Sequence, residues 1–147
     1  MDWQARYYPL DLFPGLSEKI GSLIASDQFK AVDLVHEEIE AVAPPGLKTW
    51  AATSNIFVPL VPEIQAEGAA IEALYPDLAD PKGIYQSADA YLIAHAKLES
   101  GIVLSQETSA HEKPNAKKKH FIPDVCRDLG VPCINLLGLM RREKWSF

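Results

Sequence analysis

The sequence predicts an α/β fold with a mostly parallel sheet, and three observations support this prediction. Amphipathic segments with helical spacing alternate with short apolar segments along most of the chain. The stretch from Ser87 to Glu107 reads as a helix that leads directly into an apolar strand, Ile102–Leu104. This uninterrupted apolar run is typical of a strand buried on both faces, as parallel strands are. At 147 residues the chain is expected to form a single domain over residues 1–147.

The individual elements follow from periodicity and from Pro and Gly positions. Helices are expected where apolar residues recur every three to four positions, at residues 16–26, 33–42, 47–53, 62–75, 87–100, 123–129 and 136–142. Strands are expected at the short apolar runs, residues 29–32, 56–58, 102–104 and 131–135. Residues 75–85 and 108–120 show no period and are expected to be irregular.

Helix ends are marked by particular residues. Ser87 is expected to cap the central helix, Asp89 to lie in its first turn, and Gly101 to take the left-handed position after it. Pro123 is expected to open the next helix and Gly130 to close it. In the terminal helix a broad apolar face is expected to be buried, formed by Leu136, Leu137, Leu139 and Met140.

Composition excludes several classes of protein. With 48% hydrophobic and 23% charged residues, the chain is neither disordered nor membrane-like. It has no apolar run of membrane-spanning length, and its start is too aromatic and charged for a signal peptide, so a cytoplasmic location is expected. Cys126 and Cys133 lack zinc-site spacing and are expected to be reduced thiols. The net charge of −6 means that a polyanion must meet a local basic patch.

Acidic residues lie near the ends of elements that a parallel sheet can bring together. They are Glu37, Glu38, Asp89 and Glu107. Clustered carboxylates bind hard divalent cations such as Mg²⁺, which activate water and neutralise a phosphodiester. If they converge, mutual repulsion should raise the pKa of at least one of them. The alternative is that Asp89 only complements the helix dipole and that Glu37 and Glu38 lie on a solvated helix face.

A basic run follows the last of these acids. Lys117, Lys118 and Lys119, with Lys113 and His120 nearby, are candidates for holding phosphate groups. The alternative is a solvated loop. The sequence contains no HExxH motif, P-loop, GxGxxG turn or Ser-His-Asp triad.

Several motifs together resemble one family. The segments RYYPLDLFPGL, SADAYLIAHA, IVLSQE and KKKHFIPDVCRDLGVPCINLLGLMRR are similar to the PIN-like family DUF4411. The resemblance implies a three-layer α/β/α fold with a mostly parallel sheet and Mg²⁺- or Mn²⁺-dependent cleavage of RNA. It implies that Glu38, Asp89 and Glu107 are the catalytic, metal-binding residues, with Glu37 a less suitable neighbour. It also implies a toxin of a toxin–antitoxin pair, with an antitoxin partner and a homodimer.

The start of the chain departs from this family pattern. Similar chains begin with an apolar strand of the form LLDxN, whereas this sequence starts Met1-Asp2-Trp3. Either the sequence begins at an internal methionine or the protein is a non-catalytic descendant. Without that strand we expect marginal stability, pairing with another chain, or a rearrangement that brings residues 31–34 and 102–105 together.

A non-catalytic module that binds RNA or a protein is therefore the alternative function. A flavodoxin-like small-molecule binder ranks last because no phosphate loop is present.

Overall fold

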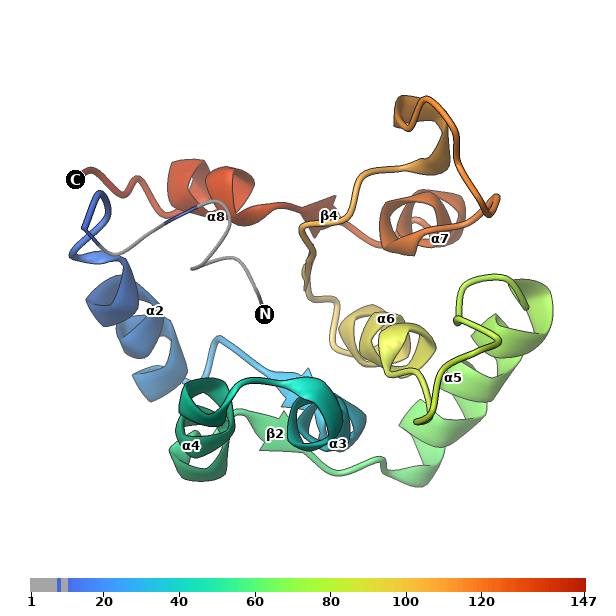
Figure 1. The fold of residues 1–147 in the computed structure, drawn as a ribbon, viewed down its shortest axis with the longest axis horizontal. Coiled ribbons are helices and arrows are strands. Elements are labelled where there is room, and N and C mark those ends of the chain that lie inside the picture. The colour runs from blue at the N-terminus through green and yellow to red at the C-terminus, as the bar shows by residue number, and fades with distance from the viewer. Residues whose placement is uncertain (1–7, 9–10) are drawn as a thin grey trace.

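The computed structural model describes residue 8 and residues 11–147 (Figure 1). Helices alternate with two-residue strands in the described part, which confirms the α/β class. The helices are α2 (Leu16–Ala25), α3 (Asp33–Val42), α4 (Pro45–Thr53), α5 (Pro62–Leu74), α6 (Asp89–Leu98), the 3₁₀ helix η1 (Ala110–Glu112), α7 (Ile122–Leu129) and α8 (Leu136–Arg142).

The strands form two separate parallel pairs rather than one sheet in the part of the chain that the structure describes. β1 (Ala31–Val32) pairs with β2 (Phe57–Val58), and β3 (Val103–Leu104) pairs with β4 (Cys133–Ile134). The parallel orientation confirms that part of the prediction. The expected rearrangement, with residues 31–34 beside residues 102–105, is not found, because β1 and β3 belong to different pairs. Figure 1 shows β2 and β4 in separate parts of the fold.

Helix α6 connects the two strand pairs through the core. It packs along α5 and also contacts β1 and β3. Its residues Ile93 and Ala94 are fully buried. The core cluster around them draws side chains from both pairs, including Val32 of β1 and Val103 of β3. The N-terminus of α6, which carries Asp89, is therefore fixed from several sides.

The α5–α6 contact depends on a glycine. A Cβ atom at Gly68 would lie 2.3 Å from Cδ1 of Tyr91, closer than any real contact of this kind. Gly68 therefore lets the Tyr91 ring lie against the backbone of α5. The Tyr91 hydroxyl donates a hydrogen bond to Oε2 of Glu72 at 3.0 Å, so the polar end of the buried ring also has a partner.

Two expected helix ends are shifted. Helix α6 begins after an Ala88 N-cap rather than at a Ser87 cap. It ends at Leu98, so Ser100, with φ of 53°, takes the left-handed position expected for Gly101. Gly130 does close α7 with φ of 68°, as predicted, and Pro123 lies in the first turn of that helix. The loop at residues 108–120, expected to be irregular, contains η1.

A second, smaller cluster joins the two ends of the described chain. Leu16 and Ile20 of α2 pack against Leu136 and Met140 of α8. Leu137 is 40% exposed, so its predicted burial is wrong. Helix α8 has only seven residues. The face that it buries against α2 is narrower than the apolar face that its sequence predicts.

Candidate functional site

The N-terminus of α6 is the centre of the candidate site. Asp89 lies in the first turn, where the partial positive charge of the helix end favours a carboxylate. Its backbone N–H points to Oγ of Ser87 at 3.4 Å. Tyr85 belongs to the connection from α5 to α6. Burial raises the pKa of its phenol, and the charges of Glu38, Asp89 and Asp80 raise it further.

Glu38 reaches this helix end from α3. Its Oε1 accepts a hydrogen bond from the backbone N of Ala88 at 2.8 Å, although the two residues are 50 positions apart. Burial raises the pKa of Glu38, and the Ala88 hydrogen bond partly offsets that rise. Its neighbour Glu37 is exposed, so of these two acids it is Glu38 that contacts the N-terminus of α6.

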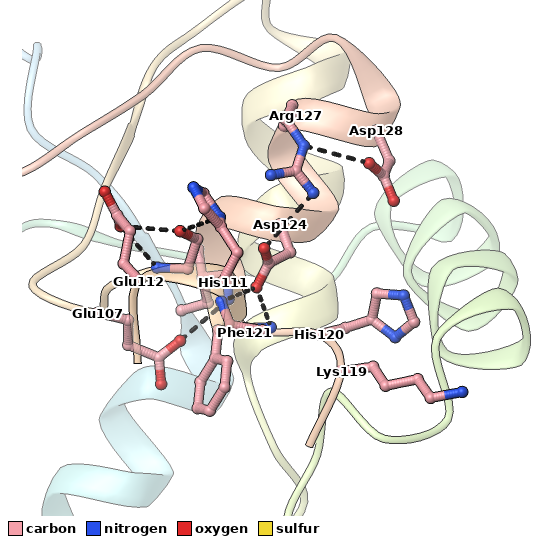
Figure 2. Close-up of polar contacts among 12 residues, drawn as sticks. Glu107, His111, Glu112, Lys119, His120, Phe121, Asp124, Arg127 and Asp128 are labelled. Atoms are coloured by element: carbon pink, nitrogen blue, oxygen red, sulfur yellow. Dashed lines mark hydrogen bonds and ion pairs between the residues drawn. The ribbon is translucent and has the colours of Figure 1, made fainter. Parts of the chain in front are cut away.

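Glu107 approaches from the end of β3. Its backbone N donates to Oγ of Ser105 at 3.1 Å, and its Oε2 accepts from the backbone N of Ile122 at 3.0 Å. Figure 2 shows this bond between the Glu107 carboxylate and the start of α7. One oxygen of Glu107 is therefore used to hold a helix terminus, as one oxygen of Glu38 is.

The three carboxylates act on one another. The pKa of Asp89 is raised to about 6, chiefly by burial and further by the charges of Glu107 and Glu38. Lys118 and the Ser87 hydroxyl act in the opposite direction. The rise agrees with the expectation of mutual repulsion, although burial is its larger cause.

Glu38, Asp89 and Glu107 offer the right kind of ligand for a hard divalent cation, but they are not arranged to surround one. Carboxylate oxygens are the ligands that Mg²⁺ and Mn²⁺ prefer. Within residue 8 and residues 11–147, however, no group of three or more His, Cys, Asp or Glu side chains is placed to hold a metal ion. Hence the described acids form a carboxylate cluster but not a complete metal cage.

The basic loop contributes one lysine to this cluster. Nζ of Lys118 donates to the carbonyl oxygen of Leu78 at 2.6 Å and lies 4.7 Å from the ring centre of Phe121. Its effect on the pKa of Asp89 places its charge near the acids. Lys119 extends away from Glu107 in Figure 2. Lys117 is exposed, so the three lysines expected to act together differ in position.

An ion pair that sequence reasoning missed holds this loop to the α5–α6 connection. Nδ1 of His120 lies 2.7 Å from Oδ1 of Asp77, and Oδ2 of Asp77 accepts from the backbone N atoms of Lys119 at 2.9 Å and His120 at 3.1 Å. These hydrogen bonds and the His120 charge outweigh desolvation and lower the pKa of Asp77. Since 43 residues separate Asp77 and His120, no local pattern indicates the pair.

Asp124 binds two backbone N–H groups of the same loop, a role that the sequence analysis did not predict. It is 3% exposed, and its Oδ2 accepts from the backbone N of Phe121 at 3.0 Å and of Ala110 at 2.8 Å (Figure 2). A signal was available, because an acid at the third position of a helix is typical of a capping box. Asp124 thereby joins η1 to the start of α7.

The two cysteines lie next to each other and are both free. The hydrogen bond to Cys133, together with burial, raises the pKa of the Cys126 thiol. The same bond lowers the pKa of Cys133. Their adjacency follows from the packing of α7 on β4.

Comparison with known protein families gives a match over the chain. The profile of a family described as Domain of unknown function (DUF4411) matches residues 1–147. No curated protein and no solved structure matches the chain. Among the helices that the structure describes, none has both the length and the apolar character needed to cross a membrane.

Proposed function

The chain belongs to the DUF4411 family, and on that premise we propose that it is a PIN-like, metal-dependent ribonuclease. The observation that carries the proposal is the convergence of Glu38, Asp89 and Glu107 from three separate elements at the N-terminus of α6. The pKa of Asp89 is raised to about 6, chiefly by burial, and the charges of Glu107 and Glu38 contribute to that rise. Perturbed carboxylates that gather at one place are typical of functional sites.

Each residue has a proposed role at this site. Asp89 and Glu107 would bind Mg²⁺ or Mn²⁺ directly, and Glu38 would hold the N-terminus of α6 and add its charge. A bound cation would supply an activated water and neutralise charge on the phosphodiester. Lys118 would contact the RNA backbone next to the acids, and Lys117 and Lys119 would contact it farther out.

The finer assignments rest on the family resemblance. They are a three-layer PIN-like fold, a toxin role with an antitoxin partner, a homodimer and a cytoplasmic location. The two parallel strand pairs joined by α6 are compatible with such a fold. A dimer or an antitoxin complex is testable by light scattering and by co-purification.

One observation favours the alternative, a non-catalytic PIN-like module that binds RNA or a protein. The described acids do not form a three-ligand metal site. A module of this kind would keep the carboxylates for the structural bonds that Glu38 and Glu107 make to helix termini. Divalent cations would then be irrelevant to its stability.

A thermal melt combined with an RNA cleavage assay separates the two functions. For the ribonuclease we expect Mn²⁺ at millimolar concentration to raise the melting temperature and to be required for cleavage of single-stranded RNA. Both effects should be lost in Asp89→Asn and kept in Glu37→Gln, which removes an exposed acid of α3. RNA binding without a metal-dependent melt or cleavage would replace the ribonuclease by the binding module.

A further inference from the structure

A short hydrogen-bonded network surrounds His111 in η1, outside the carboxylate cluster. Oγ of Ser109 donates to Oε2 of Glu112 at 2.8 Å, and Nδ1 of His111 lies 2.9 Å from the same Oγ. The backbone N of Ser109 also donates to Oε2 of Glu112, at 3.2 Å. Ser109 is only 5% exposed, so this hydroxyl lies beneath the surface while the imidazole lies above it.

The network fixes the proton positions of the imidazole. A hydroxyl has one hydrogen, which Ser109 gives to Glu112, so Nδ1 of His111 must donate its own N–H to Oγ. The hydrogen bonds from Ser109 lower the pKa of Glu112 and keep it ionised. Nε2 is then the one ring nitrogen that can gain or lose a proton, and when protonated it becomes a donor.

His111 lines a surface cavity that has a cationic character. The cavity has a volume of about 550 Å³ and is lined by Ala110, His111, Ala116, Lys117, Lys118 and Lys119. Three of its six lining residues are lysines and none is acidic. The lysine side of the cavity is held in place by Asp77, which accepts from the backbone N of Lys119. An open surface hollow lined by lysines and by one imidazole that can donate suits an anion.

We propose that this cavity is a binding site for a phosphate group, in which protonated Nε2 of His111 donates to a phosphate oxygen beside Lys117. Reading the phosphate as part of an RNA backbone rests on the proposed function, whereas the anion site itself does not. Binding is therefore linked to uptake of a proton. The charged groups around the ring are Glu112, which Ser109 links to it, Asp124 of α7 behind Ala110, and the lysines of the cavity.

The anion site is tested with sulfate, which keeps its charge over the whole pH range and needs no RNA. We follow the imidazole signals of the full chain by NMR from pH 5 to 8, with sodium sulfate or with sodium chloride at equal ionic strength. Sulfate is expected to move the midpoint of the His111 titration upward by about 0.5, which corresponds to a roughly threefold preference of the anion for the protonated ring. The His36 signal of α3 should not move and serves as the internal control.

Variants test the parts of the site separately. Ser109→Ala should reduce the sulfate response, because the imidazole loses its orienting partner. Lys117→Gln should reduce it as well, whereas Lys144→Gln, which removes the same charge beyond α8, should not. A His111 midpoint unaffected by sulfate, or an equal movement of His36 and His111, would overturn the proposal.

RNA binding connects this site to the proposed function. Affinity for a short single-stranded RNA should fall several-fold from pH 6 to pH 8 in the wild-type chain. It should change little with pH in His111→Gln and in His111→Lys, because neither side chain titrates in that range. A sulfate response without any RNA binding would keep the phosphate site and remove the proposed ribonuclease. Cleavage of RNA without a sulfate response of His111 would keep the ribonuclease and overturn this inference.

Discussion

Oε1 of Glu38 accepts a hydrogen bond from the backbone N of Ala88, the N-cap residue of α6. This carboxylate of α3 acts beside the Ser87 hydroxyl, whose Oγ accepts from the backbone N of Asp89 at 3.4 Å. The bond from Ala88 satisfies one of the donors that a helix N-terminus leaves unpaired. It also brings the negative charge of Glu38 toward Asp89 in the first turn. Burial is the largest cause of the raised pKa of Asp89, and the charges of Glu107 and Glu38 add to it.

Asp89→Asn is expected to stabilise the metal-free protein at neutral pH. The folded state raises the pKa of Asp89 from 3.8 to about 6, so the native protein holds this proton more tightly than the unfolded chain. The contribution of Asp89 to stability is therefore present at low pH and is lost as pH rises through about 6. The variant should gain about 1–3 kcal/mol relative to wild type between pH 4 and pH 7, measured by urea unfolding. A gain that does not change with pH would contradict a raised pKa at this position.

Asp77→Asn is expected to loosen the basic loop. The substitution removes the charge that pairs with His120 and weakens the bonds to the Lys119 and His120 amides. A cost of about 1 kcal/mol is expected for hydrogen bonds at this partly exposed position, with faster hydrogen exchange at the two amides. Because the folded state lowers the pKa of Asp77, its stabilising effect should be lost as pH falls through the folded value.

Asp80→Asn is the matched control in the same connection. Among the described residues, the Asp80 carboxylate accepts only a local hydrogen bond, from the backbone N of Lys82 at 2.9 Å. Its substitution should leave exchange at residues 119 and 120 unchanged. Equal effects of the two variants would show that Asp77 has no special role in holding the loop.

Leu136 and Leu137 are adjacent, yet substitution by Ala should affect them differently. Leu136 is 3% exposed and packs against α2, whereas Leu137 is 40% exposed. Leu136→Ala should cost about 2–5 kcal/mol of unfolding free energy, and Leu137→Ala less than about 1 kcal/mol. Chemical denaturation of both variants measures the difference. If the two variants lost similar amounts of unfolding free energy, α8 would be rotated about its axis relative to α2, with both leucines buried.

The sequence predicted local features better than long-range ones. Helix α6, strand β3 and the first-turn position of Asp89 follow from apolar runs and capping rules that act within a few residues. The exposure of Leu137 could not be predicted from the sequence. Helix α8 has seven residues with apolar side chains around much of its circumference, so its sequence does not indicate a unique buried face. The Asp77–His120 pair depends on where two distant loops meet. The choice of Glu38 came from family resemblance, since the periodicity of α3 alone leaves Glu37 and Glu38 equivalent.

The separation of the strands into two pairs leads to the last prediction. Among the described residues, β1 is hydrogen-bonded only to β2 and β3 only to β4, while α6 packs against both β1 and β3. An added strand that paired with both β1 and β3 would gain backbone partners on both sides, each bond contributing about 0.5–1.5 kcal/mol net. We therefore expect a chain extended at its N-terminus by a strand of the form LLDxN to melt several degrees higher than the 147-residue chain.

The same extension should change the response to metal. The aspartate of the added strand would bring a further carboxylate toward Asp89 and Glu107, so stabilisation by Mn²⁺ should appear or increase together with the rise in melting temperature. Two controls separate these effects. The form LLNxN should keep the added stability and lose the metal response, because the strand remains and the charge is gone. A strand interrupted by proline should give neither effect, because it lacks ladder hydrogen bonds. If the LLDxN and proline forms melt at the same temperature, the added strand does not pair with β1 and β3, and the two strand pairs are complete as they stand.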